Sequence, residues 1–305
     1  MGDNSQNAFG FSLLSSGSKA NSTLVTDSES GFLIDTGLSC RRTEQRLLEL
    51  GYSIDELAGV VLTHEHSDHV VGLKTIIKKY RPDIFTTSKT AEACDILDYD
   101  KLCCISSSET FSIGNFSLET FPVWHDAAEP IGMVVSKGEC RLGYCTDTGR
   151  VCENMKSRLK DLSALVIESN HDLGLLGEAP YPDRLKNRIA GDLGHLGNLA
   201  AADLLRGMAR QDERLQFIIA AHISENSNTP VIALQELEQA WASSGGWKDS
   251  KFFAATATAA TPFFQIRSIL SSASSSQTLL EDDGAIDVEG SESDSGATSK
   301  RRERA

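Results

Sequence analysis

The chain reads Thr63-His64-Glu65-His66-Ser67-Asp68-His69 between an apolar run and a helical pattern. Residues two apart at the end of an extended strand point to the same side, so His64 and His66 can bind one metal ion together. Asp68 and His69 fall at the start of the predicted helix and can face a second ion. Three imidazoles together with the carboxylate of Asp68 favour a pair of metal ions over the alternative, a solvated loop capped by Asp68.

The rest of the chain holds only four more histidines, and three of them follow or open a predicted element. His125 and His222 each come directly after a predicted strand, and His195 opens a predicted helix. Alone, His125 and His222 would be interpreted as a surface histidine and a satisfied core histidine. With the cluster at residues 63–69, we expect both to be metal ligands. Asp147 also follows an apolar strand, which favours a residue that bridges two ions over a turn-forming aspartate.

These residues resemble the metallo-β-lactamase fold superfamily, whose signature is HxHxDH. The resemblance covers about residues 9–266 and includes Leu33-Ile34-Asp35-Thr36-Gly37 at the end of an early strand. It implies an α/β fold, a four-layer αβ/βα sandwich, with two divalent metal ions as cofactors; zinc, manganese and iron all accept such ligands. Asp35 would orient the ligand loop through hydrogen bonds without contacting an ion. The implied ligands are His64, His66 and His125 for the first ion, Asp68, His69 and His222 for the second, and Asp147 between them.

Three further motifs resemble those of the YycJ/WalJ-like branch of this superfamily, a group of exonucleases and phosphodiesterases. They are the small-residue loop Ser15–Ser22, the run Glu168-Ser169-Asn170-His171-Asp172, and the run Gly194–Ala201. The chain departs from the branch at two positions. Gly197 stands where the branch has serine, and Ala20 stands where it has glycine, but neither change removes a titratable group.

The resemblance implies a mechanism in which a hydroxide that bridges the ions attacks phosphorus. His195 would then protonate the leaving oxygen as the general acid, with Glu168 as its orienting partner, and Asp68 is counted as catalytic as well as a ligand. Phosphodiester cleavage expels an alkoxide that needs a proton, whereas lactam and thioester hydrolysis need no such residue here. The structural alternative for His195 is a helix N-terminal histidine packed on its neighbours.

The sequence predicts a nucleic acid or a small phosphodiester as substrate. Candidate substrate-binding residues are Ser16, Ser18, Asn170, His171, Arg184, Arg188 and Asn198, and the backbone amides of residues 16–19 offer a further anion site. Although the net charge is −14, local charge matters more: Arg184, Lys186 and Arg188, just upstream of His195, fit a short or single-stranded end better than a long duplex footprint. The alternative function is hydrolysis of a small cyclic phosphodiester, thioester or lactone. A redox di-iron protein is disfavoured because that group has glutamate in the place of His66.

We predict a hydrolase domain over residues 1–269 and a disordered tail over 270–305, which is Ser-rich and acidic with a basic end. No apolar run has the roughly 18 residues of a membrane span, and the N-terminus has no secretory pattern. Seven cysteines, an odd number that includes the adjacent Cys103 and Cys104, indicate reduced thiols in the cytoplasm. The sequence therefore predicts a cytoplasmic enzyme without a membrane partner.

Alternation of apolar residues and turn signals predicts ten strands and six helices. The strands are Gly10–Leu14, Ser22–Thr26, Gly31–Asp35, Gly59–Leu62, Phe116–Val123, Ile131–Ser136, Cys140–Thr146, Ala164–Glu168, Gln216–Ala221 and Lys251–Ala254. The helices are Arg42–Leu50, Val70–Lys79, Val151–Leu162, Pro182–Ile189, Leu196–Ala209 and Thr229–Ala242.

Overall fold

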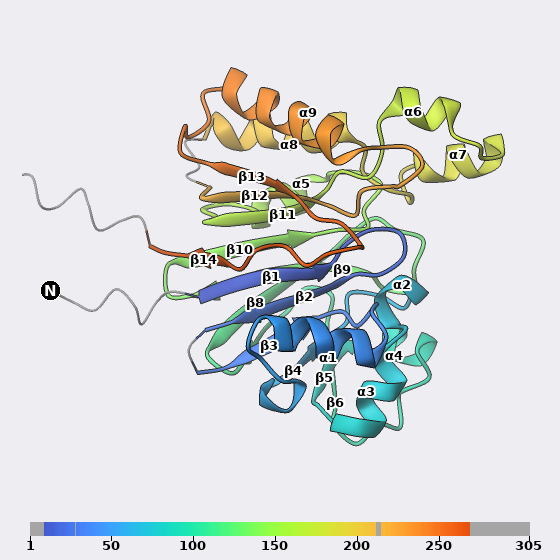
Figure 1. The fold of residues 1–305 in the computed structure, drawn as a ribbon, viewed down its shortest axis with the longest axis vertical. Helices are drawn as coiled ribbons and strands as arrows, with labels where there is room; N and C mark the ends of the chain where they lie inside the picture. Colours follow the sequence, from blue (N-terminus) through green and yellow to red (C-terminus); the bar gives the residue numbers. More distant parts are fainter. Residues whose placement is uncertain (1–8, 28, 212–214, 269–305) are drawn as a thin grey trace, which may run out of the picture. The chain divides into compact units, whose positions relative to one another are not determined.

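The computed structural model describes residues 9–27, 29–211 and 215–268 (Figure 1). The predicted boundary at residue 269 and the predicted tail over 270–305 lie outside the described residues.

Two seven-stranded sheets form the framework of the described residues. The first has the order β14-β1-β2-β3-β4-β5-β6 and the second the order β13-β12-β11-β10-β9-β8-β7. The first sheet consists of β1 (Phe9–Ser15), β2 (Ser22–Thr26), β3 (Gly31–Ile34), β4 (Gly59–Val61), β5 (Ile84–Thr87), β6 (Leu102–Ile105) and β14 (Phe264–Ile266). The second consists of β7 (Thr110–Ile113), β8 (Phe116–Pro122), β9 (Ile131–Lys137), β10 (Cys140–Cys145), β11 (Ala164–Glu168), β12 (Phe217–Ala221) and β13 (Lys251–Ala254).

The two sheets pack face to face through a shared apolar core. Phe11 and Phe32 of the first sheet lie in one buried cluster with Leu118, Tyr144 and Val166 of the second. Helices cover the outer faces, so the central strands are buried on both sides, and β1, β2 and β3 are buried at every position. Strands of this kind are nearly continuous apolar runs instead of alternating ones, which is why most of them can be recognised in the sequence.

Helices form the two outer layers. In Figure 1 they lie on the face of each sheet that points away from the other sheet. The first sheet is covered by α1 (Cys40–Glu49), α3 (Leu73–Tyr80) and α4 (Ser88–Ala93), and the second by α5 (Glu153–Arg158), α8 (Asn198–Ala209) and α9 (Pro230–Ser243). The short α2 (Ser67–Val70), α6 (Leu173–Glu178), α7 (Asp183–Ile189) and the 3₁₀ helix η1 (Ile54–Glu56) lie in the connections. This arrangement confirms the predicted four-layer αβ/βα sandwich. Within the described ranges, none of the helices combines the length and hydropathy that a membrane span requires.

The directions of the strands bring the candidate residues to one edge. Strands β3 to β6 are parallel to one another, and so are β10 to β13. Strand β8 runs in the same direction as β10, because both pair antiparallel with β9. Carboxyl ends of parallel strands meet at the same edge of a sheet, where open α/β sheets bind ligands. The loops that follow β3, β4, β8, β10, β11 and β12 therefore converge there.

Three predicted helices differ from the observed ones. The predicted helix Val70–Lys79 is two helices, α2 and α3, because Gly72 donates its backbone N–H to Thr36 O at 2.8 Å and packs against the loop after β3. The predicted helix Val151–Leu162 is only α5, whose C-cap residue Leu159 leaves the helical region at ψ 56°. The predicted helix Leu196–Ala209 begins only at Asn198, because Gly197 pairs with His171 in a strand-like bridge.

The sequence prediction also missed several short elements. Strands β5, β6, β7 and β14 have only three or four residues each, and α4 and α6 have six. Strands β6 and β7 lie at the margins of their sheets and retain exposed or half-buried positions. Such short strands are defined by their pairing with a neighbouring strand more than by a local pattern.

Candidate active site

The loop after β4 carries the motif His64 to His69, and Asp35 anchors it from the end of β3. The carboxylate of Asp35 is fully buried, and its Oδ2 atom lies 2.8 Å from Nδ1 of His69. It also accepts the backbone N–H and the hydroxyl of Thr63, both at 2.8 Å. A carboxylate that binds the rear nitrogen of an imidazole fixes the tautomer and leaves Nε2 for a metal. Asp35 thus makes the predicted contact; the sequence did not single out Thr63.

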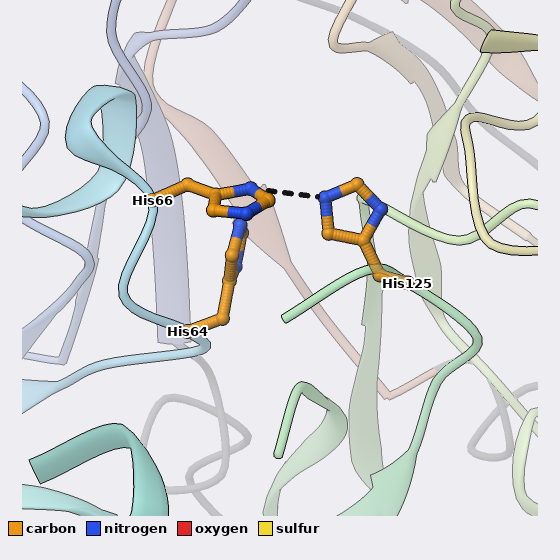
Figure 2. A group of neighbouring side chains, drawn as sticks. All are labelled: His64, His66 and His125. Atoms are coloured by element: carbon orange, nitrogen blue, oxygen red, sulfur yellow. Dashed lines mark hydrogen bonds between the residues drawn. The ribbon is translucent and has the colours of Figure 1, made fainter. Parts of the chain in front are cut away.

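His64, His66 and His125 form the first group of candidate ligands (Figure 2). Each offers one ring nitrogen, and these nitrogens lie within 4.8 Å of one another. Nδ1 of His66 is 3.1 Å from Nε2 of His125, on the loop after β8. Nε2 of His64 is buried without a hydrogen-bond partner among the described residues. An unpaired buried polar atom costs about 1–3 kcal/mol, and an ion among these rings would satisfy it.

Asp68, His69 and His222 form the second group, again with ligand atoms within 4.8 Å. Oδ2 of Asp68 is 3.3 Å from Nε2 of His222 and 3.4 Å from Nε2 of His69. Asn21 lies against the same atoms, with its Nδ2 3.0 Å from Asp68 Oδ2 and 3.0 Å from His69 Nε2. Asn21 belongs to the small-residue loop Ser15–Ser22, whose sequence alone does not indicate this contact.

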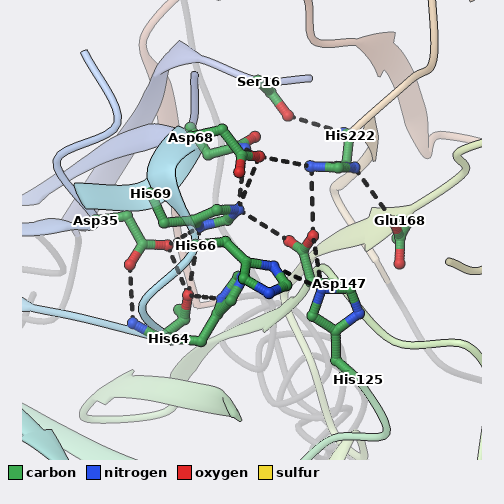
Figure 3. A network of polar contacts seen from close by, with 12 residues as sticks. Ser16, Asp35, His64, His66, Asp68, His69, His125, Asp147, Glu168 and His222 are labelled. Atoms are coloured by element: carbon green, nitrogen blue, oxygen red, sulfur yellow. Dashed lines mark hydrogen bonds and ion pairs between the residues drawn. The ribbon is translucent and has the colours of Figure 1, made fainter. Parts of the chain in front are cut away.

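Asp147, on the turn after β10, lies between the two groups (Figure 3). Its Oδ1 atom is 3.3 Å from Nε2 of His222 and 3.8 Å from Nε2 of His125, and its Oδ2 atom is 3.2 Å from Nε2 of His69. One carboxylate therefore reaches imidazoles of both groups, as the predicted bridging position requires.

The electrostatics of the cluster show how closely its charges are matched. Burial lowers the pKa of His222, but Asp147 and the neighbouring carboxylates outweigh it and raise that pKa to about 10. Burial raises the pKa of Asp147, but His222 and His69 hold it well below its usual range. Buried imidazoles and carboxylates share protons in this way. Divalent ions bind such a set of donors by displacing the protons. The residues present therefore fit a pair of divalent metal ions.

His195 and Glu168 form a pair beside this cluster. Nδ1 of His195 is 2.8 Å from Oε1 of Glu168 and 3.7 Å from Oδ1 of Asp147. Burial raises the pKa of Glu168, but His195 outweighs it and lowers that pKa to about 2, so the carboxylate is ionised. Its Oε2 atom accepts the backbone N–H groups of Thr148 at 2.8 Å and Leu196 at 3.2 Å. The side chain of Glu168 is fully buried, whereas that of His195 is 19% exposed and accessible from solvent.

The loop that carries His195 is an extended segment that precedes α8. His195 donates its backbone N–H to Ile189 O at 2.8 Å, and Asn198 donates to His171 O at 2.9 Å. The sequence prediction that His195 opens a helix is therefore wrong: it precedes α8 by three residues. A Cβ atom at position 197 would lie 2.9 Å from Nε2 of His171, so the glycine that departs from the branch pattern accommodates that ring.

Three residues of the centre have left-handed backbone. The φ angles are 61° at Asp35, 57° at Asp147 and 52° at His222. Residues other than glycine rarely adopt this region, although aspartate and histidine are among those that adopt it more readily. Each turn directs its side chain sharply out of a strand end and into the cluster.

Four predicted substrate-binding residues lie in the interior. Ser16 Oγ accepts the backbone N–H of His222 at 2.8 Å, and Asn170 Nδ2 donates to His222 O at 2.8 Å. Asn198 exchanges two side-chain hydrogen bonds with Asn228, and His171 is only 3% exposed. The side chains of Ser16, Asn170 and Asn198 are therefore hydrogen-bonded inside the protein, where Ser16 and Asn170 support His222, and a role of these four residues in substrate binding stays a prediction.

The remaining predictions for substrate contacts have different outcomes. The backbone amides of Ser16 and Gly17 bind Thr256 O at 3.1 Å and Asn21 Oδ1 at 2.9 Å, so they do not form the predicted anion site. Ser18 and Arg184 are exposed. Arg188 is exposed too, but its Nε atom is 2.6 Å from Asp126 Oδ2, so its charge is already paired.

Comparison with known proteins identifies similar chains. Residues 31–218 match the model of the beta-lactamase superfamily domain. The chain is 35% identical to exodeoxyribonuclease YycJ of Bacillus anthracis over 75% of this chain and 88% of that protein. It is 32% identical to exodeoxyribonuclease WalJ of Streptococcus pneumoniae over 86% of this chain and the whole of that protein. The metallo-β-lactamase fold protein YhfI from Bacillus subtilis is similar in structure, with a TM-score of 0.63, 13% identity, and 85% and 100% of the two chains covered.

Proposed function

Because this chain belongs to the YycJ/WalJ-like branch of the metallo-β-lactamase fold superfamily, we propose that it is a metal-dependent exonuclease that hydrolyses phosphodiester bonds of DNA. Both curated relatives are named exodeoxyribonucleases, which supports DNA as the substrate. The observation that carries the proposal is the contact between His195 and Glu168, 2.8 Å long, beside the bridging Asp147.

The cofactors are two divalent metal ions. We assign His64, His66 and His125 to one ion, Asp68, His69 and His222 to the other, and Asp147 to both, because their ligand atoms form matching groups. When bound, such a pair supplies charge neutralisation at the phosphate and activates water for attack. The set of five imidazoles and two carboxylates accepts zinc, manganese or iron, which metal analysis of the purified protein distinguishes.

His195 supplies the proton for the leaving oxygen. Its Nδ1–H is held by the ionised Glu168, so Nε2 is the nitrogen free to carry the proton that is transferred. The carboxylate of Glu168 orients the ring for this transfer through the contact with Nδ1. General acids of this kind contribute roughly 10²–10⁴-fold to the rate when the leaving group is poor. Glu168 is a positioning residue, since it acts through His195.

The test compares leaving groups. His195→Ala should slow cleavage of an oligodeoxynucleotide by about 10²-fold or more, because the departing alkoxide needs a proton. It should slow bis-p-nitrophenyl phosphate hydrolysis far less, because nitrophenolate departs unprotonated. Glu168→Gln should show a milder version of the same selectivity, and Leu193→Ala, an exposed residue on the same loop, serves as the control.

Metal content separates the two roles that His195 could have. The assignment predicts that His195→Ala retains both ions, measured by elemental analysis of the purified protein. Equal losses on both substrates with the ions retained would show that His195 does not donate the proton. Turnover of a thioester or a β-lactam without turnover of DNA would contradict the nuclease itself.

We also propose a cytoplasmic location. All seven cysteines carry free thiols, and the vicinal Cys103 and Cys104 are not joined to each other or to another cysteine. Free thiols are typical of reducing compartments. Fractionation of cells that produce the full chain tests this location.

A further inference from the structure

A cavity of about 350 Å³ lies beside the second group of candidate ligands. Its size is within the range of small-molecule sites, roughly 300–1,000 Å³. Its walls come from five separate segments of the chain, so no local sequence pattern predicts it. The lining residues include Lys19, Gly37, Arg42, Val71, Glu225 and Ala257.

The cavity adjoins the candidate metal centre through backbone and side-chain contacts. Gly37, in its wall, donates its N–H to Asn21 O at 2.8 Å, and Asn21 donates its own N–H to Asp68 O at 2.8 Å. The side chain of Asn21 contacts Asp68 and His69 directly. The cavity wall and the second group of candidate ligands therefore share contacts through Asn21, which is 1% exposed.

The charge in the cavity is positive, although the chain carries a net charge of −14. Lys19 is paired with Glu225, with Nζ 2.5 Å from Oε2. The guanidinium of Arg42 is exposed and makes no hydrogen bond or ion pair within the part of the chain that the structure describes. Helix α1 begins at Cys40, next to the cavity, and its N-cap residue Ser39 makes no side-chain cap, so the positive end of the helix dipole faces the same region. An unpaired guanidinium that sits there is available for a phosphate.

The cavity also has an apolar side. Val71 is 57% exposed, although it is a large aliphatic side chain, and Ala257 lies half-buried in the same wall. A cation beside an apolar wall suits a nucleotide, which has an anionic phosphate next to a flat base, better than it suits a free inorganic anion. Arg188, on α7, was the cation expected to bind substrate, but it is paired with Asp126. Arg42 is therefore a better candidate than Arg188 for holding the backbone of a strand.

We propose that this cavity is a nucleotide subsite, in which Arg42 binds a backbone phosphate and Val71 contacts the sugar or base of a single-stranded DNA end. The proposal rests on the proposed nuclease function and names the residues that select an oligonucleotide over a small phosphodiester. Loss of one charged hydrogen bond to a phosphate should lower the affinity for the strand by roughly tenfold.

The experiment compares Arg42→Ala with Arg41→Ala in the full, metal-loaded chain. Arg41 is the matched control, because it is exposed on the same helix, removes the same charge and does not line the cavity. Each variant is assayed on bis-p-nitrophenyl phosphate and on a single-stranded oligodeoxynucleotide of about 12 nucleotides, within the site sizes of single-strand binders. The reported quantity is the ratio of kcat/KM on the oligonucleotide to kcat/KM on the nitrophenyl diester.

Arg42→Ala should lower this ratio about tenfold, through KM, and Arg41→Ala should leave it at the wild-type value. Arg42→Lys should restore part of the loss. The slope of log affinity against log salt for the oligonucleotide should fall by about 0.7 in Arg42→Ala, as expected for one lost phosphate contact on a single strand. These results support the subsite.

Two outcomes overturn the subsite while leaving the nuclease intact: an unchanged ratio in Arg42→Ala, or an equal fall in Arg41→Ala, which would indicate a general charge effect. A wild-type protein that hydrolyses the nitrophenyl diester and not the oligonucleotide has a different meaning. That result contradicts the proposed function, and the subsite with it.

Discussion

Individual side chains behind the candidate ligands hold the imidazoles in position. Asp35 binds the rear nitrogen of His69 at 2.8 Å, and the rear nitrogen of His125 is 2.9 Å from Gly194 O. Asn170 contacts both the ring and the backbone of His222. Partners of this kind set ring orientation and raise ligand basicity, so their loss weakens metal binding without removing a ligand.

Asp147→Ala should remove at least one ion and abolish hydrolysis. The carboxylate lies between the two groups, and without it the second group loses the charge that faces His69 and His222. Elemental analysis and turnover of bis-p-nitrophenyl phosphate measure the two effects. Asp192→Ala, which removes an exposed carboxylate paired with Arg150, is the control. Two ions per chain in Asp147→Ala would show that this residue is not the bridge.

Metal affinity should rise with pH because binding displaces protons. The pKa of His222 is raised to about 10 in the metal-free protein, since burial is outweighed by Asp147. Below that pH the ring is protonated and an ion must displace the proton, so affinity falls as pH decreases, by about tenfold per unit for each displaced proton. Calorimetry in two buffers of different ionisation enthalpy counts the protons released. A count of zero at neutral pH would contradict this protonation state.

At the residue scale, the sequence predicted the chemistry of the ligands more completely than it predicted the contacts that support them. The HxHxDH spacing and strand-end positions predicted which imidazoles and carboxylates come together. The sequence did not show that Asn170 holds His222 or that Asn198 pairs with Asn228, because a motif shows that a polar residue is important without showing which way it points. Thr63 and Asn21 were missed, since their contacts join residues 28 and 47 positions apart in the sequence.

At the scale of elements, the centre depends on loops that approach one another closely. Gly37, after β3, is the clearest case: a Cβ atom there would lie 1.7 Å from Asp68 O and 2.5 Å from Asn21 N. Long buried strands and helices α1, α8 and α9 were predictable from apolar periodicity, within a few residues. The break at Gly72 and the extended segment before α8 were not, because contacts with the loop after β3 and with His171 override local helix preference.

Two glycine substitutions should have opposite effects on stability. Gly37→Ala should lower the thermal midpoint by several degrees, since overpacking typically costs about 1–3 kcal/mol and the contacting atoms are backbone. Gly207→Ala should raise it by about 2 °C, because this position lies within α8, nothing lies within 4 Å of the added Cβ, and alanine favours a helix by about 1 kcal/mol. Thermal unfolding of both metal-free variants measures the shifts. A drop for Gly207→Ala would show that the helix needs flexibility there.

At the scale of the whole molecule, the described residues form two sheets that share a buried apolar core, and the candidate site lies at one edge. The apolar core between the sheets lies within residues 9–266 and includes Phe9 and Ile266, near the two ends of the described chain. Burial on this scale is the main source of folding stability. The described residues therefore contain the core that the fold needs.

Removal of residues 271–305 should leave the thermal midpoint and the turnover of bis-p-nitrophenyl phosphate nearly unchanged. Their Ser-rich, acidic composition cannot bury enough apolar surface to offset the entropy of ordering. Truncation before residue 264 is the contrasting variant, because it also deletes β14, which pairs with β1. A midpoint several degrees lower after the first truncation would show that these residues pack on the domain.

The left-handed backbone at Asp35, Asp147 and His222 constrains how this lineage can change. Such a conformation costs about 1–3 kcal/mol for residues other than glycine, and among replacements glycine and asparagine relieve it best. A descendant released from selection for activity would therefore gain stability by acquiring glycine or asparagine at these turns, while its sheets stay intact. Inactive paralogues of this lineage should be recognisable in genomes by those substitutions, before any change in their core.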